Sequence, residues 1–114
     1  MGFFEDLNPG KGIPFMDGRY KAETRYLAGK EWHIQDFGFI KGDGGEFAVA
    51  IFAEDTIHFF FLNAVITEML HKVENAGEKA NLQRQRIRFE MRPNKKGDHE
   101  YMTFEFVGED EIPF

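Results

Sequence analysis

Hydrophobic and polar positions alternate along most of the chain, with one interruption near its middle. Alternation with a period of two is typical of a strand that buries one face. An extended segment of this kind begins at Arg19, and longer alternating runs follow at 30–41, 46–53, 56–61, 85–92 and 100–107. The pattern predicts a mainly β domain.

In the interruption, apolar residues recur at spacings of three and four, which places them on one face of an α-helix. Asn63 has the side chain of a helix N-cap, and Gly77 suits the position just beyond the last turn. We therefore predict one helix between the third and fourth long strands, followed by a polar connection. Its apolar face comprises Leu62, Val65, Ile66, Met69, Leu70 and Val73.

The first long strand carries a change of phase. Its apolar residues occupy even positions as far as Ile34 and odd positions from Phe37 onward. Such a change needs an extra residue or a sharp coil, and Asp36-Phe37-Gly38 is where a bulge fits. The run Gly42-Asp43-Gly44-Gly45 then predicts a hairpin turn.

Three strands, one helix and two strands suit the five-stranded OB-fold barrel, in which a helix lies between the third and fourth strands. The bend in the first strand is a device that barrel closure needs. A half-open β-sandwich or another small α+β sheet is the alternative with the same content.

The predicted OB-fold domain covers residues 19–107. Residues 1–18 carry Pro and Gly turn signals and are predicted to form an irregular arm. The apolar residues of this arm would pack on the domain or on a neighbouring subunit; they are Phe3, Phe4, Ile13 and Phe15. Residues 108–114 form a short acidic tail.

Composition limits the chemistry of the chain. Its 114 residues suffice for one domain, and 42% apolar residues indicate a packed core rather than disorder. The absence of Cys excludes disulfides and thiolate sites. No stretch approaches the roughly 18 apolar residues that span a bilayer, and the first residues lack the basic start of a secretion signal. We expect a cytoplasmic protein with no cofactor and no metal.

No catalytic set is visible in the sequence. The histidines are scattered over separate predicted elements, and none belongs to a known metal-binding motif. Glu68 and His71 lie three apart on the helix, a spacing that one metal ion could bridge, but a solvent-exposed salt link has the same spacing. The glycines of 42–45 lie in a hairpin and predict no phosphate-binding loop. We expect no enzymatic activity.

The formal net charge is −6, but the charges are unevenly placed. Basic residues gather between 79 and 96, and acids between 97 and 114. In the strand 85–92 the residues Ile87, Phe89 and Met91 should face the core. The opposite face and the following loop would then present Arg86, Arg88, Arg92, Lys95 and Lys96.

Arginines at alternate strand positions can follow a phosphate backbone, and their guanidinium groups can stack on bases. This interpretation makes the basic face a candidate site for single-stranded nucleic acid. The alternative is a solvated face that protects an edge strand.

Aromatic residues suggest a second part of such a site. Bulky residues at 47, 49 and 51 should point inward, as should those at 57, 59 and 61. Phe52, His58 and Phe60 would then point outward and offer rings on which unpaired bases stack. The alternative is that the arm or a second subunit covers them. Trp32, in the core or at the mouth of the groove, and Tyr101 complete the predicted single-stranded DNA contacts.

The end of the sequence is Glu109-Asp110-Glu111-Ile112-Pro113-Phe114. It resembles the acidic tip of bacterial single-stranded DNA-binding proteins, which end in acids followed by Ile-Pro-Phe. A terminal Phe with its carboxylate can enter a basic-rimmed pocket while the acids steer the approach. The internal copy Ile13-Pro14-Phe15 lacks the acids. The long linker of that family is absent, since only Gly108 separates the predicted last strand from the tip.

The resemblance implies binding of single-stranded DNA without sequence preference and recruitment of replication or recombination proteins through residues 109–114. The shortness of the chain fits a compact relative of the kind that mobile elements encode, and homo-oligomers are possible. A module that binds only proteins is the alternative. The charge layout further suggests that Glu109, Asp110 and Glu111 fold back toward Arg86, Arg88 or Arg92 and compete with DNA.

Overall fold

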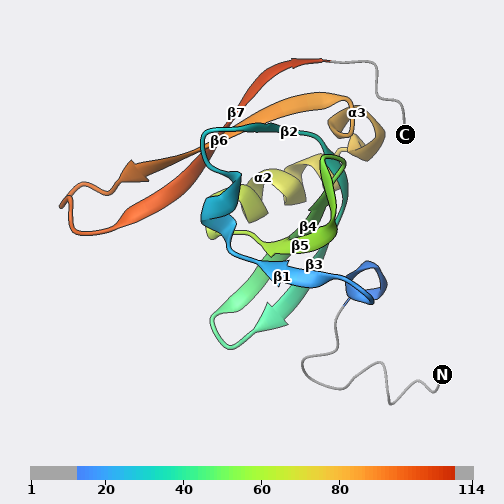
Figure 1. Cartoon of the computed structure of the whole chain (residues 1–114), viewed down its shortest axis with the longest axis horizontal. Helices are drawn as coiled ribbons and strands as arrows, with labels where there is room; N and C mark the ends of the chain where they lie inside the picture. The colour runs from blue at the N-terminus through green and yellow to red at the C-terminus, as the bar shows by residue number, and fades with distance from the viewer. Residues whose placement is uncertain (1–12, 110–114) are drawn as a thin grey trace.

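The structure is a computed structural model of the chain, and it describes residues 13–109 (Figure 1). Within this range the protein is mainly β. The strands are β1 (Tyr20–Ala22), β2 (Glu31–Trp32), β3 (Ile34–Gly42), β4 (Gly45–Phe52), β5 (Asp55–Phe61), β6 (Gln85–Pro93) and β7 (Glu100–Glu109). The helices are the 3-10 turns η1 (Pro14–Met16) and η2 (Thr24–Leu27), and the α-helices α2 (Ala64–Asn75) and α3 (Lys79–Leu82).

The strands form two sheets. One has the order β1-β5-β4-β3 and the other the order β2-β6-β7. All pairs between named strands are antiparallel except β1 with β5, which is parallel. The predicted mainly β class is confirmed, but the strands of residues 13–109 do not join into one closed barrel.

One stretch of chain links the sheets. β2 ends at Trp32, His33 follows, and β3 begins at Ile34 in the other sheet. A register shift lies between Ile34 and Asp36 in the pairing of β3 with β4, so the expected bulge is present one residue before the predicted place. The extra residue keeps Phe37 on the same core as Trp32, as a bulge should.

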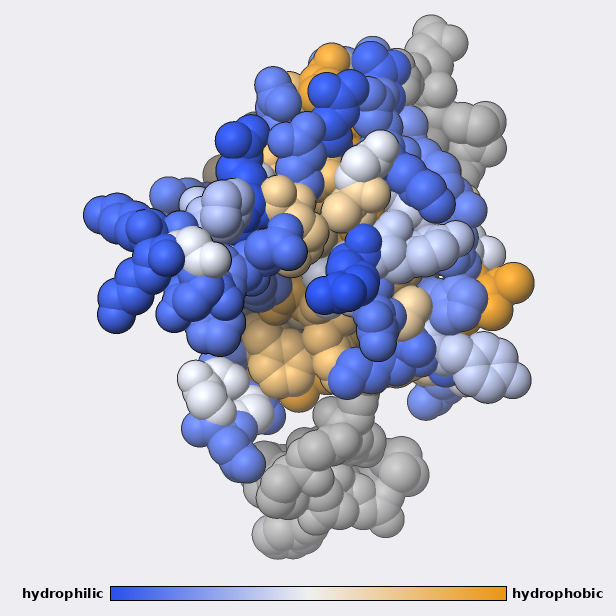
Figure 2. All heavy atoms as spheres, turned by 60° about the vertical axis from the view of Figure 1, so that its left-hand side comes forward, coloured by the Kyte–Doolittle hydropathy of each residue, from blue (hydrophilic) through white to orange (hydrophobic). Residues whose placement is uncertain are grey.

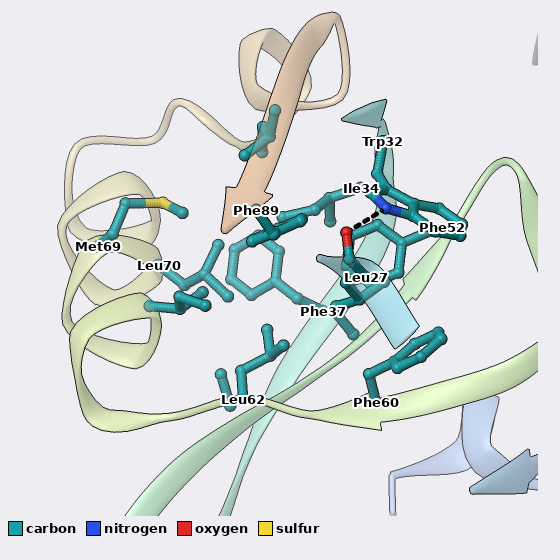
Figure 3. Packing of buried hydrophobic residues seen from close by; sticks show 14 of the residues in the cluster. Leu27, Trp32, Ile34, Phe37, Phe52, Phe60, Leu62, Met69, Leu70 and Phe89 are labelled. Atoms are coloured by element: carbon teal, nitrogen blue, oxygen red, sulfur yellow. Dashed lines mark hydrogen bonds between the residues drawn. The ribbon is translucent and has the colours of Figure 1, made fainter. Parts of the chain in front are cut away.

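The main core fills the space between the two sheets and helix α2 (Figure 3). Phe52 and Phe60 come from the first sheet, Phe89 from the second, and Leu70 from the helix; all four side chains are fully buried. The indole Nε1 of Trp32 donates a hydrogen bond to the carbonyl of Leu27 at 3.0 Å. A buried Trp needs such a partner for its N–H.

A second apolar cluster lies on the opposite face of the four-stranded sheet. Val49, Ile51 and Phe59 are its buried members. The chain around η1 covers them, because Ile13, Phe15 and Met16 pack against the cluster. Of the two predicted alternatives, the domain or a neighbouring subunit, Ile13 and Phe15 pack on the domain, while residues 3 and 4 lie outside the described range.

The helix signals are confirmed in part. The Asn63 side chain accepts a hydrogen bond from the backbone N–H of Ile66 at 3.0 Å, as an N-cap does. Gly77 follows the helix with a φ of 69°, which favours glycine. Val65, by contrast, is exposed. The predicted polar connection contains helix α3, which buries Leu82.

The face assignments of β4 and β5 were reversed. Ala48, Ala50 and Phe52 belong to the main core, whereas Val49 and Ile51 lie beneath the N-terminal cover. Small side chains let the helix approach the sheet, and the backbone N–H of Ala48 donates to the buried hydroxyl of Thr67 on α2 at 2.9 Å. The last strand also continues past its predicted end at Val107 to Glu109.

Candidate nucleic-acid interface

The outer face of β6 carries the predicted arginines. Ile87 and Phe89 are buried on the inner face, and Met91 packs against the same core. Arg86, Arg88 and Arg92 therefore share the solvent side of the sheet, as the alternation predicts. Lys95 and Lys96 are exposed in the turn between β6 and β7. This hairpin extends away from the rest of the molecule (Figure 1).

A carboxylate on the neighbouring strand β2 binds two of these arginines. Glu31 is the cross-strand partner of Arg88. Its Oε1 lies 2.9 Å from Nε of Arg86 and its Oε2 lies 2.5 Å from Nη2 of Arg88. The hydrogen bond and charge of Glu31, together with the charges of Glu105 and Glu90, raise the pKa of Arg88 above its ordinary value. Arg88 is thus a permanent cation surrounded by acids.

Two further arginines in or next to β6 also form ion pairs with carboxylates. Arg92 lies 3.2 Å from Glu90 on its own strand. Arg84, just before β6, lies 3.2 Å from Glu109 at the end of β7. The outer face is consequently a mixed-charge surface, less basic than the sequence of β6 alone indicates, and a phosphate backbone would have to replace these carboxylates. Glu109 also contacts Arg84 rather than Arg86, Arg88 or Arg92, and residues 110–114 of the predicted tail lie outside the described range.

The prediction that Phe52 and Phe60 point outward and stack on bases is wrong. Both side chains have an exposed fraction of 0%, and each packs in the main core. Trp32, with 4% exposed, belongs to the same core and does not lie at a groove mouth. The reason is the reversed assignment of strand faces, and none of the three presents a ring to solvent on which a base stacks.

Two other predicted contacts reach the surface. His58 is partly exposed and pairs with Asp55, whose Oδ2 lies 2.9 Å from the imidazole Nδ1. Tyr101 has 43% of its side chain exposed and stands opposite Arg92 in the β6–β7 ladder. Because directly opposed residues share a face of the sheet, Tyr101 extends the arginine face toward the start of β7.

Two exposed aromatic rings that the sequence did not predict as contacts lie in β1 and η2. Tyr20 is 70% exposed and Tyr26 is 51% exposed. The signal in the sequence was a tyrosine directly beside a basic residue, as in Arg19-Tyr20-Lys21 and Arg25-Tyr26. Tyr26 lies on η2, and the Lys30 ammonium lies 4.5 Å from the centre of its ring.

Two surface cavities adjoin η2. The first, of about 530 Å³, is lined by Ala22, Glu23, Arg25, Tyr26 and His58. The second, of about 350 Å³, lies between η2 and the start of β7, and Arg25, Phe61 and Tyr101 are among its lining residues. Both volumes are in the range of small-ligand sites. On the side that bears the hairpin and η2, apolar residues at the centre are bordered by hydrophilic ones (Figure 2).

Several ionisable side chains of the described residues contact one another in pairs. His33 contacts Glu54, and His71 contacts Glu46 while its ring stacks on Phe39 at 3.9 Å between centroids. Glu68 pairs with Lys72 instead of His71. Across residues 13–109 no group of three or more potential ligands is arranged to hold a metal ion. No helix in the described part of the chain has the length and apolarity to cross a bilayer.

Comparison with family models, with characterised proteins and with solved structures returned no match to this chain.

Proposed function

We propose that this protein binds single-stranded DNA without sequence preference and recruits DNA-processing proteins through its C-terminal segment. The observation that carries the DNA-binding part is the outer face of β6, which presents Arg86 and Arg88 at alternate positions and Arg92 beyond Glu90, and continues into the lysines of a protruding hairpin. Successive residues on one face of a strand are roughly 6–7 Å apart. That spacing fits contacts with successive backbone phosphates of a single strand.

We further propose that the two-sheet fold is an open variant of the OB arrangement. The β2–β3 segment contributes to both sheets, and α2 lies between the third and fourth long strands, as in that fold. Here the short strand β1, rather than β7, borders β5. The fold alone does not determine function, so the proposal rests on the charged face.

A titration with fluorescent oligo(dT) at two salt concentrations tests DNA binding directly. We expect binding at low salt that weakens steeply as salt rises, since each displaced counterion contributes about −0.7 to the log–log slope. Duplex of the same length should bind more weakly. Equal affinity for duplex, or no binding at low salt, would exclude the proposal.

Glu31 offers a sharper version of this test. Glu31→Gln removes the carboxylate that occupies Arg86 and Arg88, so we expect higher affinity for oligo(dT) and a steeper salt dependence. Arg88→Gln should act in the opposite direction. Glu68→Gln removes an exposed acid of α2 that pairs with Lys72 instead of an arginine of β6, and is the matched control. If Glu31→Gln leaves affinity unchanged at low salt, the outer face of β6 is not the DNA-binding surface.

A module that binds only proteins is the second candidate, and the carboxylates that pair with Arg84, Arg86, Arg88 and Arg92 favour it. Balanced ion pairs on a sheet face suit a protein interface as well as a nucleic-acid one. The two candidates differ in the oligo(dT) titration, which the second predicts to be negative at every salt concentration.

Recruitment through the C-terminal segment rests on sequence alone. Its test compares proteins that bind the complete chain with those that bind a variant lacking Phe114. We expect replication or recombination proteins to bind only the former, because the ring is the proposed anchor. Deleting residues 109–114 should also raise DNA affinity at low salt if the acids compete for the arginines. An unchanged affinity would exclude that competition and leave the docking role standing.

A further inference from the structure

Arg25 differs from the other arginines of the described chain. Arg84, Arg86, Arg88 and Arg92 contact carboxylates, and Arg19 donates to two backbone carbonyls. Within residues 13–109, the guanidinium of Arg25 makes no hydrogen bond or ion pair. It is exposed on η2 and lines both surface cavities described above. An available guanidinium in the wall between two cavities is suited to bind an oxyanion that bridges them.

Tyr26 gives the first cavity a rigid aromatic wall. Its ring is parallel to that of Phe60 within 12°, with 6.4 Å between centroids, and it lies 6.0 Å from the ring of Trp32. These buried neighbours fix the orientation of Tyr26, while 51% of its side chain remains exposed. The Lys30 ammonium lies over this ring. A planar base can take the place of that ammonium, and Lys30 is then available for a phosphate.

Tyr101 gives the second cavity an exposed aromatic residue. It lies at the start of β7, where it is the cross-strand partner of Arg92. Tyr101 thus lines this cavity and also borders Arg92 at the end of the outer face of β6. A strand of nucleic acid that follows the arginines would reach Tyr101 first, then Arg25, then Tyr26.

We propose that Arg25, Tyr26 and Tyr101 form a subsite for single-stranded nucleic acid, in which Arg25 binds a phosphate between two bases stacked on the tyrosines. The ligand chemistry is an unpaired base on each side of a phosphodiester, which single-stranded DNA and RNA share. This inference rests on the proposed single-strand binding and extends it from the β6 face to the N-terminal half of the chain.

Substitutions test the subsite, with oligo(dT) and oligo(U) as separate ligands. Arg25→Gln should reduce the log–log salt slope by about 0.7. Tyr26→Ala and Tyr101→Ala should each weaken binding about tenfold with little change in slope, whereas Tyr26→Phe keeps the stacking ring and should bind like the unaltered protein. Binding of both oligonucleotides supports a subsite for the base and phosphodiester that DNA and RNA share. A preference for one shows which of the two nucleic acids is the ligand.

The chain offers a matched control for Tyr101. Phe106 lies on the same strand and is equally exposed, at 43%, but belongs to the opposite face. Phe106→Ala should leave oligonucleotide affinity unchanged. Because Tyr26 packs on buried rings, thermal unfolding is measured for each variant. Arg25→Gln breaks no bond within the described residues and therefore tests the subsite even if Tyr26→Ala unfolds.

Photo-crosslinking locates the strand independently. Oligo(dT) carrying 5-iodouracil, irradiated in complex with the unaltered protein, should yield adducts at Tyr26 and Tyr101. If the unaltered protein binds but adducts occur only on β6 and its hairpin, and Arg25→Gln binds with the original slope, the subsite is wrong and the proposed function stands. If the unaltered protein binds neither oligonucleotide at low salt, both proposals are wrong.

Discussion

The two faces of the four-stranded sheet are both apolar, yet they are buried by different means. On one face, Phe52 and Phe60 meet a helix and a second sheet and are fully buried. On the other, Phe59 lies beneath the short chain segment around η1 and remains 8% exposed. The size of a side chain therefore does not decide which face becomes the main core. The decisive factor is which face a helix can approach.

Among the substitutions that test the two faces, Phe60→Ala should reduce stability the most. Its ring contacts the rings of Phe52 and Trp32 in the middle of the main core, and we expect the free energy of unfolding to fall by about 3–5 kcal/mol. Urea unfolding measures the loss. Ile57→Ala, on the same strand and 62% exposed, is the control and should change stability by less than about 0.5 kcal/mol. Equal losses in the two variants would contradict the observed faces.

Phe59→Ala tests the thinner side of the sheet. The cover around η1 is a short segment that can collapse onto the space left by the ring, so we expect a smaller loss of about 2–3 kcal/mol. The same urea unfolding experiment gives the value. A loss as large as that of Phe60→Ala would show that the two faces are equally packed.

Arg19→Gln tests how the cover is attached. The guanidinium of Arg19 donates to the carbonyl of Phe15 at 2.6 Å and to that of Thr56 on β5 at 2.7 Å. Losing these bonds should reduce the free energy of unfolding by about 1–2 kcal/mol and speed hydrogen exchange around η1. Arg25→Gln removes an arginine without such bonds and should leave both quantities unchanged. Unaltered exchange in Arg19→Gln would mean that apolar contacts alone hold the cover.

Gly38→Ala should reduce stability the least. A Cβ at this position would come within 2.6 Å of Cδ1 of Ile13, the flexible end of a side chain in the cover. Ile13 can rotate away, so we expect a loss below about 1 kcal/mol. Adding Ile13→Ala removes the clash, and the double variant should be more stable than the sum of the single changes predicts. Strict additivity would mean that the two residues do not touch in solution.

Local patterns were sufficient for the long strands and for helix α2, but not for η2 or α3. The alternation in β6 placed Ile87 and Phe89 inside, and the N-cap signal of Asn63 located the helix start. The assignment of faces failed in β4 because both faces are apolar, so that periodicity could not select one. Ala48 and Ala50 are small because α2 lies against them, and that contact depends on a helix that comes later in the chain.

The candidate site shows the same division between local and distant information. The exposure of Arg86, Arg88 and Arg92 follows from alternation within β6. The pairing of Arg86 and Arg88 with Glu31 could not be derived, since Glu31 and Arg88 are 57 residues apart. Tyr26 was overlooked because the chain before β2 was read as an extended segment, whereas it forms the turn η2 against the core.

The parallel pairing of β1 with β5 determines when β1 joins the sheet during folding. Three residues of β1 find their partners only after β5 exists, since Tyr20 pairs with His58. Closing that long loop is entropically costly, and a three-residue ladder recovers little of the cost. β1 is therefore expected to join the sheet late in folding and to open often in the native state. Because η1 directly precedes β1, the cover shares this low opening energy. The turn η2 does not, since its Leu27 is fully buried and accepts the indole hydrogen bond of Trp32.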